Sequence, residues 1–190
     1  ALIKTISEPH HENPFSGVEP VYRVTLGELV RQIKIFKESR TDLRIEDFSD
    51  TFIKKLYATY CSHIPADQFA YPLTQKSDSR GTLAEIFKAG GHGQFFVSRT
   101  KSGIARGNHY HDTKVEKFIV LEGDAIIKLR NVSTNERYEY VVRGHDLKVV
   151  DIPPGWTHSI QNTGAADLVV LFWSSELYDV ARSDTYPMEA

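Results

Sequence analysis

The pattern of apolar positions along this chain of 190 residues changes near residue 80. Before that point, apolar residues recur at steps of three and four, which is the period of an amphipathic helix. Beyond it, short apolar runs alternate with turn residues, as is typical of consecutive strands without helices between them. The sequence therefore predicts a helical segment over residues 1–75 and a mainly β domain over residues 76–190.

Two helices are predicted in the first segment. A capping box (T-x-x-E) at residues 25–28 begins a helix that extends to about residue 39, with one apolar face made of Leu26, Leu29, Val30, Ile33 and Phe36. A second helix begins near residues 49–50 and extends to Cys61, ahead of Pro65, and its inward residues are Phe52, Ile53, Leu56, Tyr57 and Tyr60. Two short helices do not make a core by themselves, so we expect them to need another surface.

The second segment reads as a series of short strands. After a polar connection at residues 66–81, apolar runs bounded by turn signals occupy residues 83–87, 94–100, 117–120, 124–132, 137–143, 148–152, 159–162 and 168–174. Many short strands at regular spacing favour a β-sandwich or barrel. Residues 176–190 are predicted to form an extended or briefly helical tail.

Composition limits the classes of protein to which this chain can belong. Apolar residues make up 41% of the chain, enough for a core, and the net charge of −2 gives no basic field for nucleic acid. The single cysteine, Cys61, excludes an internal disulfide. No apolar run approaches the length of a membrane span, and no secretory leader is visible, which favours the cytoplasm. The chain begins with Ala1 and not Met, which indicates processing or a piece of a longer protein.

Residues 103–123 carry the first candidate chemistry, because they read G-x5-H-x-H-x4-E-x6-G. His109 and His111 lie two apart, so on a strand both side chains face the same side. After a short polar turn, Glu116 re-enters a strand on that side. Two imidazoles and a carboxylate that converge make half of a divalent-metal site, suited to zinc, iron, manganese or nickel.

A fourth ligand follows at residues 153–162, which read P-x-G-x2-H-x3-N. The Pro-Pro-Gly turn starts a strand with His158, which can lie beside the first motif. Each histidine alone is more often a surface or hydrogen-bonded core residue; the combination of four ligand types favours a metal site. His10 and His11 are further histidines that could bind a metal, but adjacent histidines in a proline-flanked loop are expected to be ordinary solvated side chains.

The two motifs resemble those of the cupin superfamily, which implies a jelly roll (a double-stranded β-helix). Leu147 stands where the second cupin motif has glycine, and Gly144 lies three residues earlier. The stretches 107–130, 149–173 and 175–187 resemble more closely the C-terminal cupin domain of the bifunctional capsular polysaccharide enzymes. These enzymes form UDP-2-acetamido-2,6-dideoxy-L-talose on the route to UDP-N-acetyl-L-fucosamine. Residues 21–40 and 50–60 resemble the end of that family's reductase domain.

The resemblance implies a reaction and a set of roles. It implies epimerisation at C3 of a UDP-linked 4-keto-6-deoxy-N-acetylhexosamine, with Zn²⁺ held by His109, His111, Glu116 and His158. The base is not identified by the resemblance. From their places in the sequence, Lys114 is a candidate for the catalytic base or for a contact to the pyrophosphate, and Arg106 is a candidate for the pyrophosphate contact. Trp156, with Trp173, is a candidate stacking partner for uracil. The ordinary alternatives are solvated charges and core aromatics.

The resemblance also shows what this sequence lacks. The glycine-rich nucleotide fingerprint and the helical Y-x-x-x-K pair of the reductase are not in it, so no NAD(P) is expected in this chain. The two helices would then lack the sheet that they pack on in the family. We expect them to dock on the β domain, to pair in a dimer, or to take altered positions.

Other functions stay open at this point. The domain could be a non-catalytic dimerising or sugar-binding module with a structural metal, because closed four-ligand zinc sites are usually structural. It could also be another cupin enzyme, such as an iron dioxygenase or a sugar-phosphate isomerase. Apolar strands such as residues 168–173 favour a homodimer, and the expected partner is a UDP-sugar.

Overall fold

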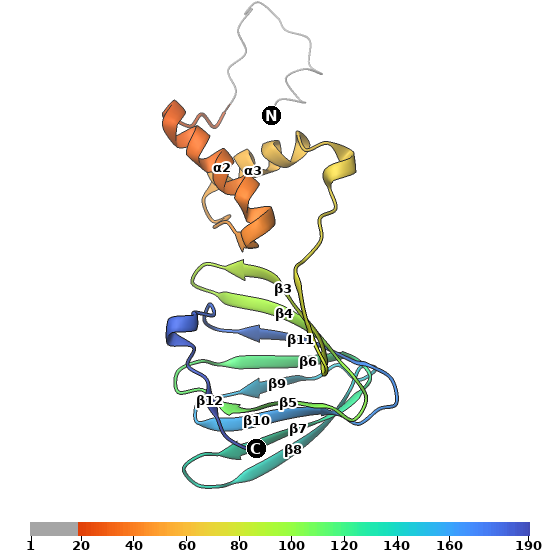
Figure 1. The fold of residues 1–190 in the computed structure, drawn as a ribbon. Helices are drawn as coiled ribbons and strands as arrows, with labels where there is room; N and C mark the ends of the chain where they lie inside the picture. The colour runs from red at the N-terminus through yellow and green to blue at the C-terminus, as the bar shows by residue number, and fades with distance from the viewer. Residues whose placement is uncertain (1–18) are drawn as a thin grey trace, which may run out of the picture.

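The computed structural model describes residues 19–190, in which two helices precede a two-layered β domain (Figure 1). The mainly β jelly roll predicted from the sequence is confirmed. His10 and His11 lie outside the described residues.

Both predicted helices are present and capped as the sequence indicates. In α2 (Leu26–Asp42), the Thr25 hydroxyl accepts the Glu28 N–H at 3.2 Å, and the Glu28 carboxylate accepts the Thr25 N–H at 2.8 Å. In α3 (Thr51–Ser62), the carboxylate of Asp50 caps the first turn. Helix α2 extends three residues beyond the predicted end.

The apolar face of α2 is only partly covered. Phe36 is fully buried, and its ring lies 5.1 Å from that of Tyr57 and 5.6 Å from that of Tyr60. Leu26 is 77% exposed, and Val30 and Ile33 are also exposed. The helix pair therefore has a small aromatic centre of its own and leaves much of the predicted face open.

Among the described residues, the strands form two sheets. The first has the order β1-β3-β4-β11-β6-β9, with β2 paired to β3, and its strands are β1 (Arg44–Ile45), β2 (Gln75–Asp78), β3 (Gly81–Ala89), β4 (Gly93–Thr100), β6 (Glu116–Glu122), β9 (Val149–Ile152) and β11 (Leu168–Ser174). The second has the order β12-β5-β10-β7-β8, and its strands are β5 (Ala105–Tyr110), β7 (Asp124–Asn131), β8 (Arg137–Arg143), β10 (Trp156–Asn162) and β12 (Tyr186–Pro187). Short 3₁₀ helices η1 (Ala66–Gln68) and η2 (Val180–Arg182) lie outside the sheets.

The hydrophobic core lies between the sheets. Alternate residues of the facing strands supply it: Phe118, Val120, Ala125, Ile127, Leu129, Val142, Val150, Ile152, Ile160, Leu168 and Val170. This alternation is the period-two pattern expected of strands with one buried face. The core fills one part of the interior and leaves the rest to polar side chains described below.

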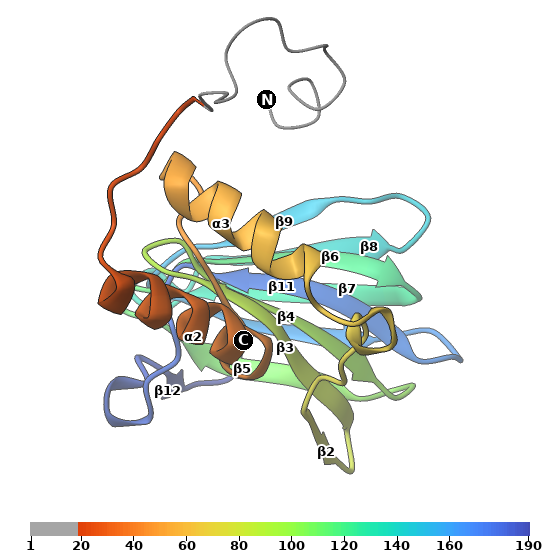
Figure 2. The ribbon, with the colours of Figure 1, turned by 90° about the horizontal axis from the view of Figure 1, so that it is seen from above.

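The helices dock on the edge of the first sheet (Figures 1 and 2). Leu43, which follows α2, has a φ of 62°, and this left-handed turn lets the chain continue into β1. Strand β1 then pairs in parallel with the end of β3, and the Lys88 N–H donates to the Leu43 carbonyl at 2.7 Å. Docking on the β domain was one of the three arrangements expected. The division into two domains near residue 75 stays a prediction.

Strands β1, β2 and β12 were not predicted. They are short and exposed and lie at sheet edges, where no buried face imposes an apolar pattern. No helix within residues 19–190 is long and apolar enough to cross a membrane.

We predict that Phe36→Ala destabilises the helix pair selectively. Loss of this buried ring should cost about 3–5 kcal/mol locally, because the aromatic cluster around it collapses only partly. Hydrogen exchange followed by mass spectrometry should show amides of α2 and α3 losing protection while those of β6, β7 and β10 keep theirs.

Leu26→Ala is the matched control for this prediction. Its side chain is largely exposed, so the change should alter stability by no more than about 0.5 kcal/mol. Equal loss of protection in the β strands of Phe36→Ala would show that helices and sheets unfold as one unit, against the predicted boundary.

Candidate metal centre

The candidate centre is built where β5 approaches β10. The pairing shifts there, because His109 lies opposite His158 but Gly107 lies opposite Ser159. Asn108 is therefore the extra residue of a β-bulge, and its φ is 60°. A bulge bends its strand and changes the direction of its side chains. Here it places His109 of the first motif opposite His158 of the second.

Gly107 makes this approach possible. Its φ is +100°, and a Cβ built on it would lie 2.6 Å from the His158 carbonyl oxygen and 2.9 Å from the Ser159 Cα. Any larger residue would push the two strands apart at the point where the histidines meet. The glycine is thus required by both its backbone conformation and its contacts.

The structure brings together all four residues proposed as ligands. One ligand atom each from His109, His111, Glu116 and His158 lies within 4.8 Å of the others. The His109 ring centre is 4.5 Å from that of His158 and 4.9 Å from that of His111. The carboxylate oxygen Oε2 of Glu116 lies 3.4 Å from His111 Nε2 and 3.3 Å from His158 Nε2.

These residues fit a divalent metal. Tetrahedral zinc with bonds of about 2.0–2.1 Å spaces its ligand atoms about 3.3–3.4 Å apart, close to the two separations observed. Nε2 of His111 and both ring nitrogens of His158 are buried and have no hydrogen-bond partner within residues 19–190. Orphaned buried nitrogens are costly unless something binds them, and a metal ion would satisfy one on each ring.

The charges of the group also suit a cation. Burial works to raise the pKa of Glu116, but the rings of His111 and His158 together lower it to about 2, so the carboxylate is ionised. Burial, with the neighbouring histidines, lowers the pKa of His109 to about 4, which leaves its ring neutral at pH 7. For His111, burial acts to lower the pKa, but Glu116 and the Asp184 carbonyl raise it above its ordinary value.

The turn of the second motif has a direct part in this arrangement. Gly155, with a φ of +73°, donates its N–H to the carbonyl of His111 at 2.8 Å. Asn162 is fully buried, and its amide donates to the Thr100 and Ala166 carbonyls and accepts from the Gly164 N–H. The turn and the asparagine of P-x-G-x2-H-x3-N thus hold β10 in place, while the side chain of His158 faces the other three candidate ligands.

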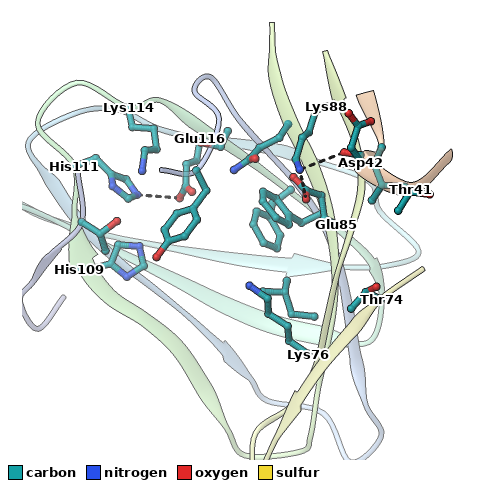
Figure 3. Close-up of a pocket in the computed structure, with 18 residues that line it drawn as sticks. Thr41, Asp42, Thr74, Lys76, Glu85, Lys88, His109, His111, Lys114 and Glu116 are labelled. Carbon is teal, nitrogen blue, oxygen red and sulfur yellow. Dashed lines mark hydrogen bonds and ion pairs between the residues drawn. The ribbon is translucent and has the colours of Figure 1, made fainter. Parts of the chain in front are cut away.

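A cavity of about 560 Å³ opens beside the group and is lined by His109, His111 and Glu116, whereas His158 lines a smaller cavity. In Figure 3, His109, His111, Lys114 and Glu116 gather at one end of it. The far end is lined by residues of the α2–β1 junction and of β2 and β3: Thr41, Asp42, Thr74, Lys76, Glu85 and Lys88. The cavity therefore extends from the candidate metal ligands to the place where the helices dock.

Comparison with known proteins identifies the family of the β domain. A family model described as the polysaccharide biosynthesis C-terminal domain matches residues 76–186. The chain belongs to this family.

Two relatives of the chain are informative. It is 41% identical over 169 residues to a UDP-2-acetamido-2,6-beta-L-arabino-hexul-4-ose reductase of Pseudomonas aeruginosa, a match that covers 89% of this chain and 45% of that protein. The solved structure of the capsular polysaccharide assembling protein CapF from Staphylococcus aureus matches with a TM-score of 0.89 at 42% identity, covering 100% of this chain and 52% of CapF. CapF solved with the inhibitor 3-isopropenyl-tropolone matches with a TM-score of 0.90, over 55% of its chain. This chain thus spans about half the length of these relatives.

The two basic residues proposed for catalysis and substrate binding, Lys114 and Arg106, lie in different surroundings. Lys114 is buried at the metal end of the cavity, and its Nζ donates to the Ser183 carbonyl at 2.6 Å. Arg106 lines a smaller cavity of about 120 Å³ behind the ligands, and its Nε donates to Thr100 Oγ1 at 3.0 Å. Their proposed roles as base and pyrophosphate contact stay predictions.

The two tryptophans lie away from the large cavity. Trp156 packs against the hydrophobic core, with its ring 5.9 Å from that of Tyr138, and Trp173 donates its indole N–H to the His92 carbonyl. Neither is among the residues that line the cavity of about 560 Å³. Stacking on uracil stays a prediction for both, and the packing agrees with the ordinary core alternative for Trp156.

Sequence reasoning missed the contribution of the C-terminal tail. Tyr178 and Thr185 line the large cavity, and Asp184 contacts the loop between the ligands. The tail was part of the family resemblance, which was a signal that it matters. Nothing in its own spacing indicated that it returns to residues some 70 positions earlier.

We predict that Gly107→Ala disrupts the centre. The clash with the His158 carbonyl and the positive φ should together cost at least about 1–3 kcal/mol and weaken zinc binding. Urea unfolding of the metal-free protein and zinc titration of the folded protein measure the two effects separately.

Gly103→Ala is the matched control. Gly103 also has a positive φ (+74°), but a Cβ there would meet nothing within 4 Å. It should lose stability through backbone strain alone and keep its zinc affinity. Wild-type zinc affinity in Gly107→Ala would contradict the role given to the strand approach.

Proposed function

We propose that this chain uses a divalent metal ion to exchange the proton at C3 of a UDP-linked 4-keto-6-deoxy-N-acetylhexosamine and so to invert that carbon. The observation that carries the proposal is the group of four ligand-type side chains, three of which line a cavity of about 560 Å³. Cavities of roughly 300–1,000 Å³ are the usual size for small-molecule sites. The names of the relatives, a UDP-sugar reductase and a capsular polysaccharide assembling protein, support nucleotide-sugar chemistry.

The proposed reaction suits these residues. A proton beside a ketone is weakly acidic, because its removal builds negative charge on the ketone oxygen. Bound by the three histidines and Glu116, a divalent ion, for which we propose zinc, would supply a Lewis acid for that charge. The chain itself has to orient the sugar, exclude water and move the proton.

Two side chains that line the cavity can carry protons. Lys114 is held by a neutral acceptor, the Ser183 carbonyl, and faces the cavity from the loop between the ligands. Tyr178 lines the same cavity, and its hydroxyl forms no hydrogen bond with the described part of the chain. Inversion needs a proton to leave one face of the carbon and another to arrive on the opposite face, so we assign these two groups as the pair.

The far end of the cavity suits the diphosphate. Lys88 is paired with Glu85 at 3.1 Å and donates to the Asp42 carbonyl, whereas Lys76 forms no ion pair within residues 19–190. A diphosphate near Lys76 would place the sugar toward the ligands, with the nucleoside beside the docked helices.

A structural metal in a non-catalytic module is the alternative, favoured by the presence of four protein ligands. The half-buried His109 and the large cavity beside the group favour catalysis instead. The homodimer and the cytoplasmic location stay predictions.

We expect the zinc-loaded protein to exchange deuterium from D₂O into C3 of a UDP-linked 4-keto-6-deoxy sugar. Loss of the H3 proton signal and the mass increase that accompanies replacement of one hydrogen by deuterium report it directly. His158→Ala should abolish exchange, and removal of the base, through Lys114→Ala or Tyr178→Phe, should slow it by about 100–10,000-fold.

His145→Ala is the control, because His145 is exposed and outside the ligand group. It should exchange at the wild-type rate. A folded, zinc-bound wild-type protein that binds the sugar nucleotide without exchange would refute the catalytic proposal and support the structural one.

A further inference from the structure

The loop between the two halves of the first motif is held by a residue far along the chain. Residues 112–114 belong to the loop that connects His111 to the strand that begins at Glu116. Their three successive backbone N–H groups all donate to the carboxylate of Asp184, at 2.9, 3.1 and 3.0 Å. The Thr113 hydroxyl shares its one proton between this carboxylate, at 3.1 Å, and that of Glu176, at 3.0 Å. One side chain thus accepts three of the four backbone donors of the loop, and the fourth, the Val115 N–H, donates to Ser175 Oγ at 3.0 Å.

Asp184 also fixes the orientation of a proposed ligand. Nδ1 of His111 is hydrogen-bonded to the backbone carbonyl of Asp184, which leaves Nε2 to face Glu116 and the metal position. A metal-binding imidazole is commonly held in this way by a carbonyl on its other nitrogen. The φ of Asp184 is +43°, and this left-handed conformation aims its carbonyl and its carboxylate at the same loop.

The residues around Asp184 anchor it on both sides. Before it, the Ser183 carbonyl accepts from Lys114 Nζ. After it, β12 pairs with β5 so that Tyr186 lies opposite Tyr110, with their rings stacked 5.1 Å apart, and Pro187 lies opposite His109. Figure 1 shows this C-terminal segment returning along the β5 edge of the second sheet.

We propose that Asp184 is a positioning residue for the metal site, and that the C-terminal segment 183–187 pre-forms the geometry of His109 and His111 before metal binds. The proposal rests on the metal site assumed in the proposed function. Without the carboxylate, three backbone donors lose their acceptor and the loop is free to move. Metal binding then has to order the His111 side chain, and the conformational entropy lost in doing so lowers the metal affinity.

The test measures zinc affinity itself, by competition with a chromophoric chelator, on the full chain. Asp184→Ala should weaken zinc binding by about 10–100-fold, which is the usual effect of losing a group that orients a metal ligand. Asp184→Asn keeps one side-chain acceptor oxygen that Asp184→Ala lacks. Its zinc affinity should therefore lie between that of Asp184→Ala and that of the wild type. The visible spectrum of the Co²⁺-substituted protein should change in the same order, because it reports the geometry of the bound ion.

Asp179→Ala is the matched control on the same tail. Asp179 also accepts a backbone N–H, that of Ala181, at 2.9 Å, but it does not contact residues 111–114. Its zinc affinity should stay within about twofold of the wild type. If Asp184→Ala does not fold, by far-ultraviolet circular dichroism, Asp184→Asn decides.

Wild-type zinc affinity and an unchanged cobalt spectrum in a folded Asp184 variant would overturn the proposal. That result would leave the proposed function intact, since zinc would still bind. Weak zinc binding in the variant together with a wild-type protein that binds zinc but exchanges no deuterium would support the positioning role and refute the catalytic one.

Discussion

The site depends on the close approach of β5 and β10 at Gly107. Because no Cβ fits between the strands there, the bulge at Asn108 can form and His109 can lie opposite His158. The first motif supplies two histidines and a glutamate, and the second supplies one histidine, so neither motif alone completes the group. The contact between the two strands joins them, and the Gly155 turn ties the second motif to the His111 carbonyl.

Much of the fold followed from local rules. The capping box at Thr25 and the alternation of core residues are short-range signals, and both appear in the structure as predicted. The side on which Arg106 lies could not be read that way. Simple alternation from His109 would turn Arg106 outward, but the extra residue at Asn108 turns it inward, opposite Ile160.

The parts of the site that sequence did not reveal depend on long-range return of the chain. Asp184 reaches the ligand loop from about 70 residues away, and no periodicity encodes that contact. The partly open face of α2 is similar in kind: its apolar spacing predicts a buried stripe, but only the end near Phe36 finds partners among the described residues. The chain spans about half the length of its relatives, yet the four metal-ligating candidates and the cavity lie entirely within it.

Zinc binding by the folded protein tests the central claim most directly, measured as equivalents bound after dialysis against buffered zinc. The account predicts about one equivalent for the wild type and for His145→Ala, and loss of binding in His158→Ala, because three ligands remain and one buried partner is gone. Equal zinc binding by the wild type and His158→Ala, or no zinc on the folded wild type, would contradict it.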